Sequence, residues 1–228
     1  MTNGLIRRTF ITMKQSILRR QLPYARLNVT LWLIILNIFV FFVNTLMPSS
    51  RYYLSLIPSM ILGRGYIWQF VTYMFCHANI SHILFNMLGL FFFGYQLEEQ
   101  LGSYEFLLYY LLTGVLAGVL SFGIYVASGY YNVVLLGASG AIFAVLLAFA
   151  TYFPDARIFI MGIIPIRAAV LVLLYTGIEI FSQLFGSRSG VAHLTHLAGF
   201  GFGYLYFLIR LGINPIHRIL PPKRGPWG

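Results

Sequence analysis

The sequence has few charged residues. Only 9% of its 228 residues are Asp, Glu, Lys or Arg, whereas an ordinary soluble domain carries about 25%. A shortage of this size excludes an ordinary water-soluble domain, because most side chains must face lipid or other protein groups. Acidic residues are the scarcest: 5 Asp and Glu stand against 15 Lys and Arg, which gives a formal net charge of +10.

Cysteine is almost absent as well. The one cysteine, Cys76, excludes an intrachain disulfide and leaves the redox compartment open. No cationic residue lies near it in sequence, so we expect a small apolar packing residue rather than a nucleophile. A cleavable signal peptide is not expected, because basic residues are spread from Arg7 to Arg26 and the apolar run that follows is long enough to span a bilayer.

The basic residues do not indicate nucleic-acid binding. They lie at the ends of the chain and in turns rather than along one stripe or face. Contact with a membrane surface accounts for them better. We therefore expect no nucleic-acid partner.

Long apolar runs dominate the sequence, since 59% of its residues are hydrophobic. A helix that crosses a bilayer needs about 20 mostly apolar residues, and its backbone polar groups must be satisfied within the helix. Six runs qualify: roughly 27–46, 80–97, 104–127, 137–153, 166–185 and 191–211. We predict an all-α, six-helix membrane bundle over residues 27–211, with basic cytoplasmic segments at 1–26 and 212–228.

The distribution of Lys and Arg predicts the orientation, because positively charged loops stay in the cytoplasm. Six lie in the N-terminal tail, two between the fourth and fifth runs and four at the C-terminal end, whereas the opposite side holds only Arg51, Arg64 and Arg188. Both termini are therefore expected in the cytoplasm, and the second, fourth and sixth spans begin at the outer face. The stretch 51–79, which is aromatic and interrupted by Pro58, is expected to lie in the outer interface.

Four polar residues near the outer ends of these three spans point to a site, because polar groups inside a membrane are costly and mark functional positions. They are His82 and Asn86 on the second span, Ser139 on the fourth and His196 on the sixth. His82 and Asn86 are four residues apart and share a helix face. Taken alone, Ser139 is interpreted as a packing residue and His196 as a packing or relay histidine, but their gathering at one depth favours a functional site.

Small residues allow the fourth and sixth spans to pack closely. Gly199 and Gly203 form one face of small residues, called a thin face here because it lets another helix approach closely, and Ala141, Ala144 and Ala148 form a second such face. Such faces can bring Ser139, whose helix-starting N–H groups suit a developing negative charge, within hydrogen-bonding reach of His196. This is the minimum for a serine nucleophile activated by a base.

The remaining titratable residues are weaker candidates. No Asp or Glu is placed to complete a catalytic triad, so a Ser–His dyad is the simpler interpretation. Glu179, inside the fifth span, either orients a catalytic group or forms an interhelical hydrogen bond. We expect His77 to be structural, His193 to face water at the edge of its span and His217 to be solvated in the basic tail.

Three separated motifs resemble those of bacterial rhomboid intramembrane serine proteases. They are His82-Ile-Leu-Phe-Asn86, Gly137-Ala-Ser139-Gly140-Ala141 and Ala192-His193-Leu-Thr-His196-Leu-Ala-Gly199. The segments Trp68-Gln69-Phe-Val-Thr72-Tyr-Met-Phe-Cys-His77 and Glu98-Glu-Gln-Leu101-Gly102-Ser103 also fit, so the resemblance covers roughly residues 51–211.

The resemblance implies roles for individual residues. Ser139 would be the nucleophile and His196 the general base. The oxyanion would be held by the side chains of His82 and Asn86 and by the backbone N–H of Ser139.

Two positions depart from the family pattern. Phe143 stands where the family often has a Tyr stacked under the catalytic histidine, which keeps the ring and drops the hydroxyl. Gln69 stands where the family often has Arg, which puts a charge-based tether of the 51–79 loop in question.

The resemblance also implies a serine endopeptidase that cleaves membrane-anchored, single-span proteins near the outer end of their transmembrane helix. We expect a multi-pass protein of a bacterial inner membrane, with its active site toward the outer face and with no metal or other cofactor. The alternatives are a non-catalytic rhomboid-like protein that binds membrane clients, and a transporter or channel with a His–Ser relay. The expected gate for substrate is the fifth span with its outer loop, Gly186–Gly190.

Overall fold

Helices make up most of the computed structural model, which describes residues 19–20, 22–160, 163–185 and 191–220. The expectation of a mostly helical protein is confirmed, and six helical segments coincide with the six predicted spans to within a few residues. They are α1 (Val29–Leu46), a continuous α5–α6 unit (Ile80–Leu101), α7 (Ser103–Ala127), α8 (Ser139–Tyr152), α9 (Ala168–Phe185) and α10 (Val191–Tyr206) with its π-helical end (Phe207–Leu211).

The α5–α6 unit is continuous but not uniform. α5 (Ile80–Gly89) leads through a π-helical stretch (Leu90–Gly94) into α6 (Tyr95–Leu101). By length and composition, this unit, α1 and α7 can each cross a membrane, whereas α8 and the first part of α9 are shorter apolar helices. Several apolar helices packed together are compatible with a membrane bundle.

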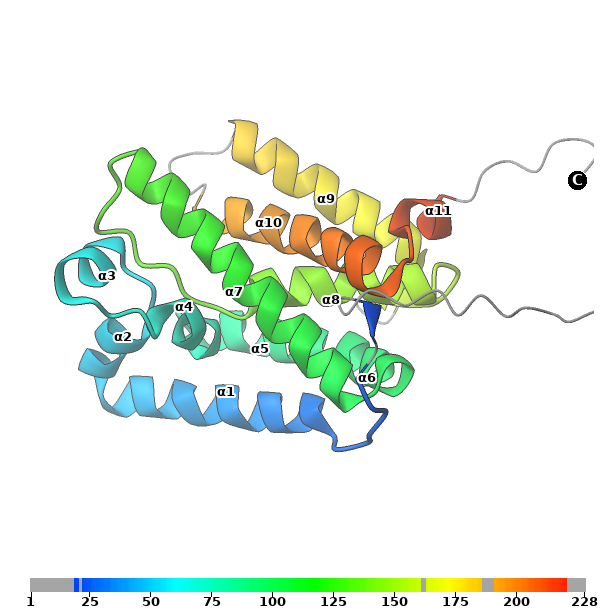
Figure 1. The fold of residues 1–228 in the computed structure, drawn as a ribbon, viewed down its shortest axis with the longest axis horizontal. Coiled ribbons are helices and arrows are strands. Elements are labelled where there is room, and N and C mark those ends of the chain that lie inside the picture. The colour runs from blue at the N-terminus through cyan, green and yellow to red at the C-terminus, as the bar shows by residue number, and fades with distance from the viewer. Residues whose placement is uncertain (1–18, 21, 161–162, 186–190, 221–228) are drawn as a thin grey trace, which may run out of the picture.

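α8 is the centre of the bundle, because 11 of its 14 residues are buried. Figure 1 shows α7, α9 and α10 near it, while α1 lies along the edge of the molecule opposite α9. α10 packs against α7, α8 and α9. A helix that is buried on nearly all sides must be apolar all round, which explains why small and aliphatic residues fill α8.

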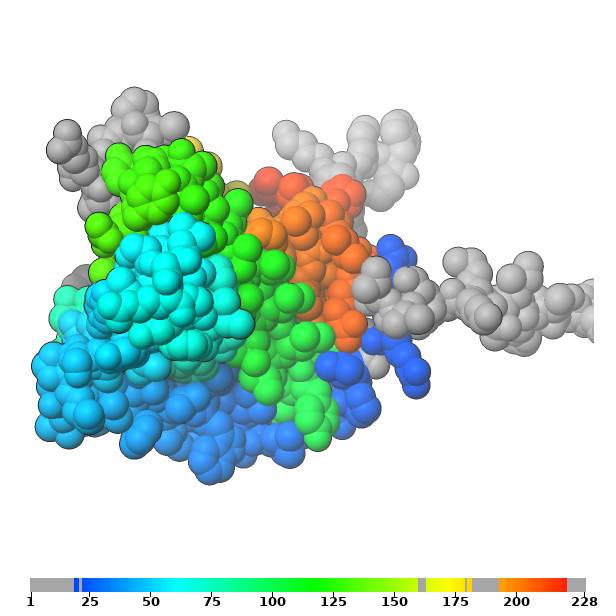
Figure 2. Space-filling model, turned by 60° about the vertical axis from the view of Figure 1, so that its left-hand side comes forward, coloured from blue at the N-terminus to red at the C-terminus, as the bar shows by residue number. Residues whose placement is uncertain are grey.

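Three short helices cover one end of the bundle: α2 (Pro48–Leu54), α3 (Pro58–Arg64) and α4 (Gln69–Thr72). Proline in the first turn starts α2 and α3, where its missing N–H is not needed. In Figure 2, where this end comes forward, the cyan residues of this stretch lie in front of α1 and α7. These helices make up most of the segment that the sequence assigns to the membrane interface.

A buried glutamine holds this end together. The side chain of Gln69 accepts a hydrogen bond from the Ile57 N–H at 3.0 Å and donates to the carbonyl oxygens of Tyr52 at 3.1 Å and Tyr53 at 3.2 Å. One amide therefore ties α4 both to α2 and to the residue before α3. Gln69, at the position where the family often has Arg, therefore tethers this segment through hydrogen bonds of an uncharged side chain.

A short antiparallel hairpin follows α8, although the sequence pattern does not predict it. β1 (Arg157–Ile160) pairs with β2 (Ile164–Arg167), and Ile158 lies opposite Ile166. The β-branched isoleucines of these two strands favour an extended backbone. The segment between α8 and α9 is also too short to form a stable helix of its own. The all-α interpretation must therefore be extended to include one two-stranded sheet.

The N-terminus of α1 is capped by a residue distant in sequence. Its own N-cap residue, Asn28, has a left-handed conformation and makes no side-chain cap. Instead, the buried carboxylate of Glu98 accepts hydrogen bonds from the N–H groups of Val29 at 2.7 Å and Thr30 at 2.8 Å, and from the Ser103 hydroxyl. A negative charge at this position also suits the helix dipole.

A second buried carboxylate, Glu105, joins three segments. It accepts hydrogen bonds from Arg210 and from the Tyr206 hydroxyl, which lie at the end of the sixth helical segment, and from the Leu22 N–H at 3.2 Å. A buried charge is costly unless it is paired. These contacts therefore hold the N-terminal segment, α7 and the end of α10 in one arrangement.

Helices α8 and α10 touch through their backbones. A Cβ placed on Gly199 would lie 2.0 Å from the carbonyl oxygen of Gly140, and one placed on Gly203 would lie 3.1 Å from the Cβ of Ala144. The thin faces noted in the sequence meet each other at these points. At Gly199, only glycine allows so close an approach.

Gly199→Ala should destabilise the detergent-solubilised protein by at least about 2 kcal/mol, because the added methyl group forces α8 and α10 apart. The matched control is Gly201→Ala on the same helix, where no atom lies within 4 Å of the added Cβ. That change should be neutral or slightly stabilising, since a helix favours alanine over glycine by about 1 kcal/mol. Equal thermal unfolding midpoints for the two variants would contradict the backbone contact.

Glu98→Ala should destabilise the fold by about 2–4 kcal/mol, because it leaves the first N–H groups of α1 and the Ser103 hydroxyl without their acceptor. Thermal unfolding in detergent measures the loss. Glu99→Ala removes the same charge from the adjacent, exposed residue and should change the midpoint little. A Glu98 variant as stable as the Glu99 variant would show that this carboxylate does not stabilise the start of α1.

Candidate active site

Ser139 and His196 lie side by side where α8 and α10 touch. Ser139 is the first residue of α8, and His196 lies on α10 about one turn before Gly199. The Ser139 Oγ and His196 Nε2 atoms are 2.8 Å apart, which is a hydrogen-bonding distance. Because the contact between Gly140 and Gly199 lies directly beside this pair, the two glycines set how closely the serine and the histidine approach.

The ring of His196 is held by an aromatic side chain. Phe143, one turn after Ser139 on α8, stacks on the imidazole with ring centroids 4.2 Å apart and planes 8° from parallel. Phe143 is in turn packed edge-on by Phe200, at 5.0 Å, and by Tyr175, at 6.0 Å. A stacked ring restricts rotation of the imidazole and keeps Nε2 directed at the serine.

The turn before α8 leaves room for a second imidazole. Gly137 has a φ of +122°, which residues with side chains rarely adopt, and its N–H donates to the Tyr73 carbonyl oxygen at 2.9 Å. A Cβ on Gly137 would lie 2.8 Å from Cε1 and 2.9 Å from Nε2 of His82. Glycine is therefore required here by conformation and by space, and the His82 ring lies against the turn that carries Ser139.

The contacts of His82 define which nitrogen carries the proton. Its Nδ1 atom accepts a hydrogen bond from the Ala78 N–H at 3.3 Å. In a neutral imidazole one nitrogen accepts and the other donates, so the proton is on Nε2, beside Gly137. His82 can therefore donate a hydrogen bond to a group bound next to Ser139.

Asn86 lies one turn further along α5 and lines the same cavity as Ser139. It is buried, and its Nδ2 atom donates to the His82 carbonyl oxygen at 2.7 Å. An amide nitrogen carries two hydrogens, so one donor remains for a group in the cavity. The same bond fixes the Asn86 side chain against its own helix.

The start of α8 adds backbone donors at the same point. The Ala138 carbonyl oxygen accepts from the Ile142 N–H at 3.0 Å, so the N–H groups of Ser139, Gly140 and Ala141 have no partner within the helix. The positive end of the helix dipole also lies here. These donors and the dipole suit an oxygen atom that gains negative charge.

A cavity of about 470 Å³ lies beside these groups. Its polar end holds the two histidines, the asparagine and the serine described above, and its remaining walls are apolar. Phe85, Leu88 and Phe92 come from the α5 side, Leu171 and Tyr175 from α9 and Ile158 from β1. The cavity is therefore bounded by α5 on one side and α9 on the other.

His77 is fully buried next to His82, and the two ring centroids are 5.1 Å apart. Burial, together with the nearby His82, lowers the pKa of His77 to about 4. Its ring is therefore neutral at neutral pH. His77 packs against one of the two imidazoles of the site and does not line the cavity itself.

The other candidates lie away from the cavity. Of the carboxylates whose side chains the structure describes, none lines it, and Asp155 pairs with Arg167 at 3.7 Å. The side chain of Glu179 and the loop Gly186–Gly190 lie outside the described residues.

The two remaining histidines do not line the cavity. His193 is half-buried, with its ring centroid 6.4 Å from that of His196, and His217 is exposed on α11 (Pro215–Ile219). In the described part of the chain, no group of three or more His, Cys, Asp or Glu side chains is placed to hold a metal ion.

A hydroxyl pair next to the site is not singled out by the sequence pattern. Thr195, the buried residue before His196, shares a 2.7 Å hydrogen bond with Ser121 of α7. This bond fixes the rotation of α10 relative to α7. A signal was present, because Ser121 is a polar residue inside the third apolar run.

Comparison with known proteins identifies a family. A Rhomboid domain profile matches residues 64–213, which is more than half of the chain. The chain is 35% identical over 123 residues to Rhomboid-like protein 11, chloroplastic, of Arabidopsis thaliana, covering 53% of this chain and 41% of that protein. It is 31% identical over 171 residues to RHOMBOID-like protein 1 of the same plant, covering 75% of this chain and 41% of that protein. It is also 30% identical over 169 residues to rhomboid protease GluP of Bacillus subtilis, covering 74% of this chain and 29% of that protein.

These matches concern a shared core rather than whole proteins. The chain spans less than half the length of each of these relatives. The matched range nevertheless contains α5, α8 and α10, which carry the polar end of the cavity. Both the motifs and the matched domain show that the chain belongs to the rhomboid family.

Proposed function

We propose that this chain is a serine endopeptidase that cleaves membrane-anchored proteins within the bilayer. The observation that carries the proposal is the 2.8 Å contact between Ser139 Oγ and His196 Nε2 at the N-terminus of α8, inside a largely apolar cavity. A serine beside a neutral imidazole can give up its proton as it attacks a carbonyl carbon. The name of GluP, which is called a protease, agrees with this activity.

In this mechanism, His196 Nε2 takes the proton of Ser139 while Oγ attacks the carbonyl carbon of the scissile peptide bond. The tetrahedral intermediate carries a negative oxygen, which accepts hydrogen bonds from the Ser139 N–H, the His82 Nε2–H and the Asn86 amide. His196 then gives the proton to the leaving amine, the C–N bond breaks and an acyl-enzyme remains. A water molecule then attacks the ester carbon as His196 takes its proton. The bond from that carbon to Oγ breaks, His196 returns the proton to Oγ and the carboxylic acid product leaves.

The substrate route that fits this site runs laterally between α5 and α9. The cavity has walls from both helices, and two of its residues, Phe85 at 71% exposed and Phe92 at 55%, also face outward. A transmembrane helix that arrives through lipid can contact these aromatic rings and unwind toward Ser139. The candidate gate is therefore the side of α9 that faces α5.

The placement in the membrane is part of this proposal. We infer six spans within residues 27–211, and a bacterial inner membrane with residues 1–26 and 212–228 in the cytoplasm and the site toward the outer face. In Figure 1, residues 22–28 and α11 lie at one end of the bundle and α2–α4 at the other, which agrees with this orientation. The substrates are then single-span proteins cut near the outer end of their helix.

A non-catalytic role, in which the chain binds membrane clients without cutting them, is the alternative. Two of the relatives are named rhomboid-like rather than protease. The contact between Ser139 and His196 favours catalysis, because a client-binding protein does not need it. A fluorophosphonate probe distinguishes the two roles: labelling of Ser139 in folded protein supports the protease, and no labelling supports client binding.

Ser139→Ala should abolish cleavage of a single-span reporter in proteoliposomes, because the attacking oxygen is removed. Asn86→Ala should lower kcat by about 10²–10³-fold with a smaller effect on KM, since an oxyanion donor acts in the transition state. Ser128→Ala, at the exposed end of α7, is the control and should cleave at the wild-type rate. Undiminished cleavage by Ser139→Ala would overturn the nucleophile assignment.

Phe143→Leu should lower kcat by about tenfold or more, because the aliphatic side chain no longer presents a flat face that orients the imidazole of His196. Phe143→Tyr keeps the ring and should retain most of the activity. The same reporter assay compares the two variants. If the leucine variant turned over as fast as the tyrosine variant, the stacked ring would have no part in positioning the base.

A further inference from the structure

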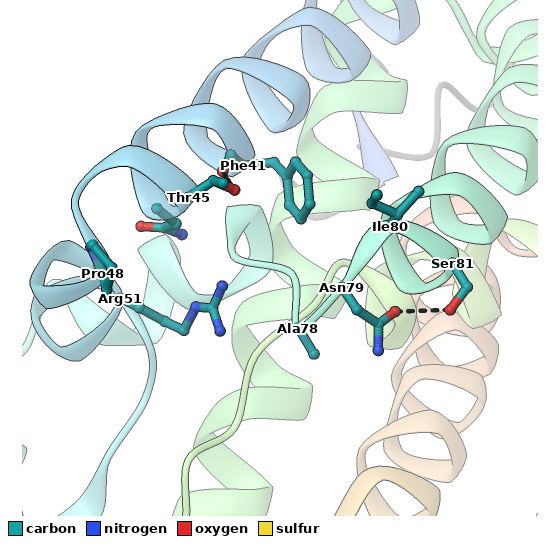
Figure 3. Close-up of a pocket in the computed structure, with 9 residues that line it drawn as sticks. Phe41, Thr45, Pro48, Arg51, Ala78, Asn79, Ile80 and Ser81 are labelled. Carbon is teal, nitrogen blue, oxygen red and sulfur yellow. Dashed lines mark hydrogen bonds between the residues drawn. The ribbon is translucent and has the colours of Figure 1, made fainter.

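A second cavity, of about 640 Å³, lies at the end of the bundle that α2–α4 cover. Its walls come from the last turns of α1, the start of α2 and the turn that leads into α5, and it shares no lining residue with the Ser139 cavity. Figure 3 shows the Arg51 side chain projecting from α2 across this space toward Ala78, with Phe41 and Ile80 nearby. The cavity thus combines one cation with an apolar rim.

The polar groups on its wall include buried donors. Asn44, on the last turn of α1, is 1% exposed, and its Oδ1 accepts from Ser50 Oγ at 2.6 Å. Its Nδ2 has no nitrogen or oxygen partner among the described residues and faces only the Cys76 thiol. The Nε atom of Arg51 is also buried and has no described partner. The thiol of Cys76, which lies near Asn44 and whose pKa is raised by burial, is only a weak acceptor. Buried donors of this kind favour a bound acceptor.

The turn into α5 supplies further donors. Asn79 Oδ1 accepts from Ser81 Oγ at 2.8 Å, as drawn in Figure 3, and from the His82 N–H at 2.9 Å. The side-chain oxygen of Asn79 is therefore engaged, while its side-chain nitrogen, Nδ2, stays available as a donor. The positive end of the α5 dipole lies at the same wall.

Among the described residues, Arg51 has no acidic neighbour to balance its charge. The sequence contains no Asp or Glu before Glu98, and α6, which carries Glu98, lies at the end of the bundle opposite α2 in Figure 1. Among the described residues, no carboxylate forms an ion pair with Arg51. A partly buried guanidinium favours an anion, and its planar fork matches the oxygen atoms of a phosphate.

The position of the cavity indicates where such an anion comes from. α1 has 18 residues and is about 27 Å long, close to the thickness of the hydrocarbon core, so its last turn lies at a membrane interface. Leu46, at 80% exposed, and Ile80, at 73%, lie at the same end of the bundle and face outward. A molecule with a phosphate and apolar chains fits both the donors and this surface.

We propose that this cavity binds the phosphate of an anionic phospholipid. Arg51 and Asn44 donate to the phosphate oxygens, and the acyl chains lie over α1 and the start of α5. The quaternary ammonium of a choline headgroup would be repelled by the Arg51 guanidinium and would meet no described carboxylate on the wall. Phosphatidylglycerol should therefore bind in preference to phosphatidylcholine.

Native mass spectrometry of the full chain in detergent tests this, with phosphatidylglycerol or phosphatidylcholine added as the probe. We expect one retained phosphatidylglycerol and a preference of about tenfold or more over phosphatidylcholine, which Arg51→Gln removes. The matched control is Arg64→Gln, which removes the same charge from an exposed position on α3 at the same end. Equal retention of phosphatidylglycerol by the two variants would overturn the proposal.

Three further measurements do not depend on the folding of Arg51→Gln. On wild-type protein, a photoactivatable phosphatidylglycerol should label residues 41–51 or 78–81, and labelling only elsewhere would overturn the site. Asn44→Asp replaces the donor with a carboxylate of the same shape that can pair with Arg51, so it should release the lipid, and retention would contradict the proposed contacts. Thermal stabilisation by inorganic phosphate, with none from phosphatidylglycerol, would overturn the lipid as the ligand. None of these readouts requires proteolytic activity.

Discussion

The backbone contact between Gly140 and Gly199 is the constraint on which the rest of the structure depends. In lipid, helices gain little from burying apolar groups against each other, so close approach of small residues provides much of the packing. This approach brings a hydroxyl of α8 within 2.8 Å of an imidazole of α10 and places Phe143 under the same ring. A larger residue at Gly199, where an added Cβ would lie 2.0 Å from the Gly140 carbonyl oxygen, would separate the helices and, with them, Ser139 and His196.

Around that contact, the charged groups are distributed unequally between the two ends of the bundle. At one end, the carboxylates of Glu98 and Glu105 are satisfied by backbone N–H groups, hydroxyls and an arginine, and they join segments that are distant in sequence. At the other end, an uncharged amide, Gln69, does the joining, and Arg51 has no described carboxylate partner. The carboxylates of one end are thus satisfied within the described part of the chain, whereas the guanidinium at the other end meets no described carboxylate.

The apolar runs and the polar exceptions inside them could be predicted, because length, hydrophobicity and residue type are local properties of a sequence. The roles of the site residues stay predictions. Other features depend on which group a side chain meets across the fold, and no spacing rule indicates that Gln69 reaches two carbonyl oxygens of α2 or that Thr195 pairs with Ser121. The sequence does not indicate the hairpin, because strands of four residues are too short to show a clear alternation.

The cap on α1 has a consequence for how the protein is made. The N–H groups that donate hydrogen bonds to Glu98 belong to residues 69 and 68 positions before it in the chain. During translation, α1 is therefore complete while the acceptor for its first turn has yet to be synthesised. The first turn of α1 can form these hydrogen bonds only after the α5–α6 unit has been synthesised. α1 is thus made early, but its N-terminal cap forms late.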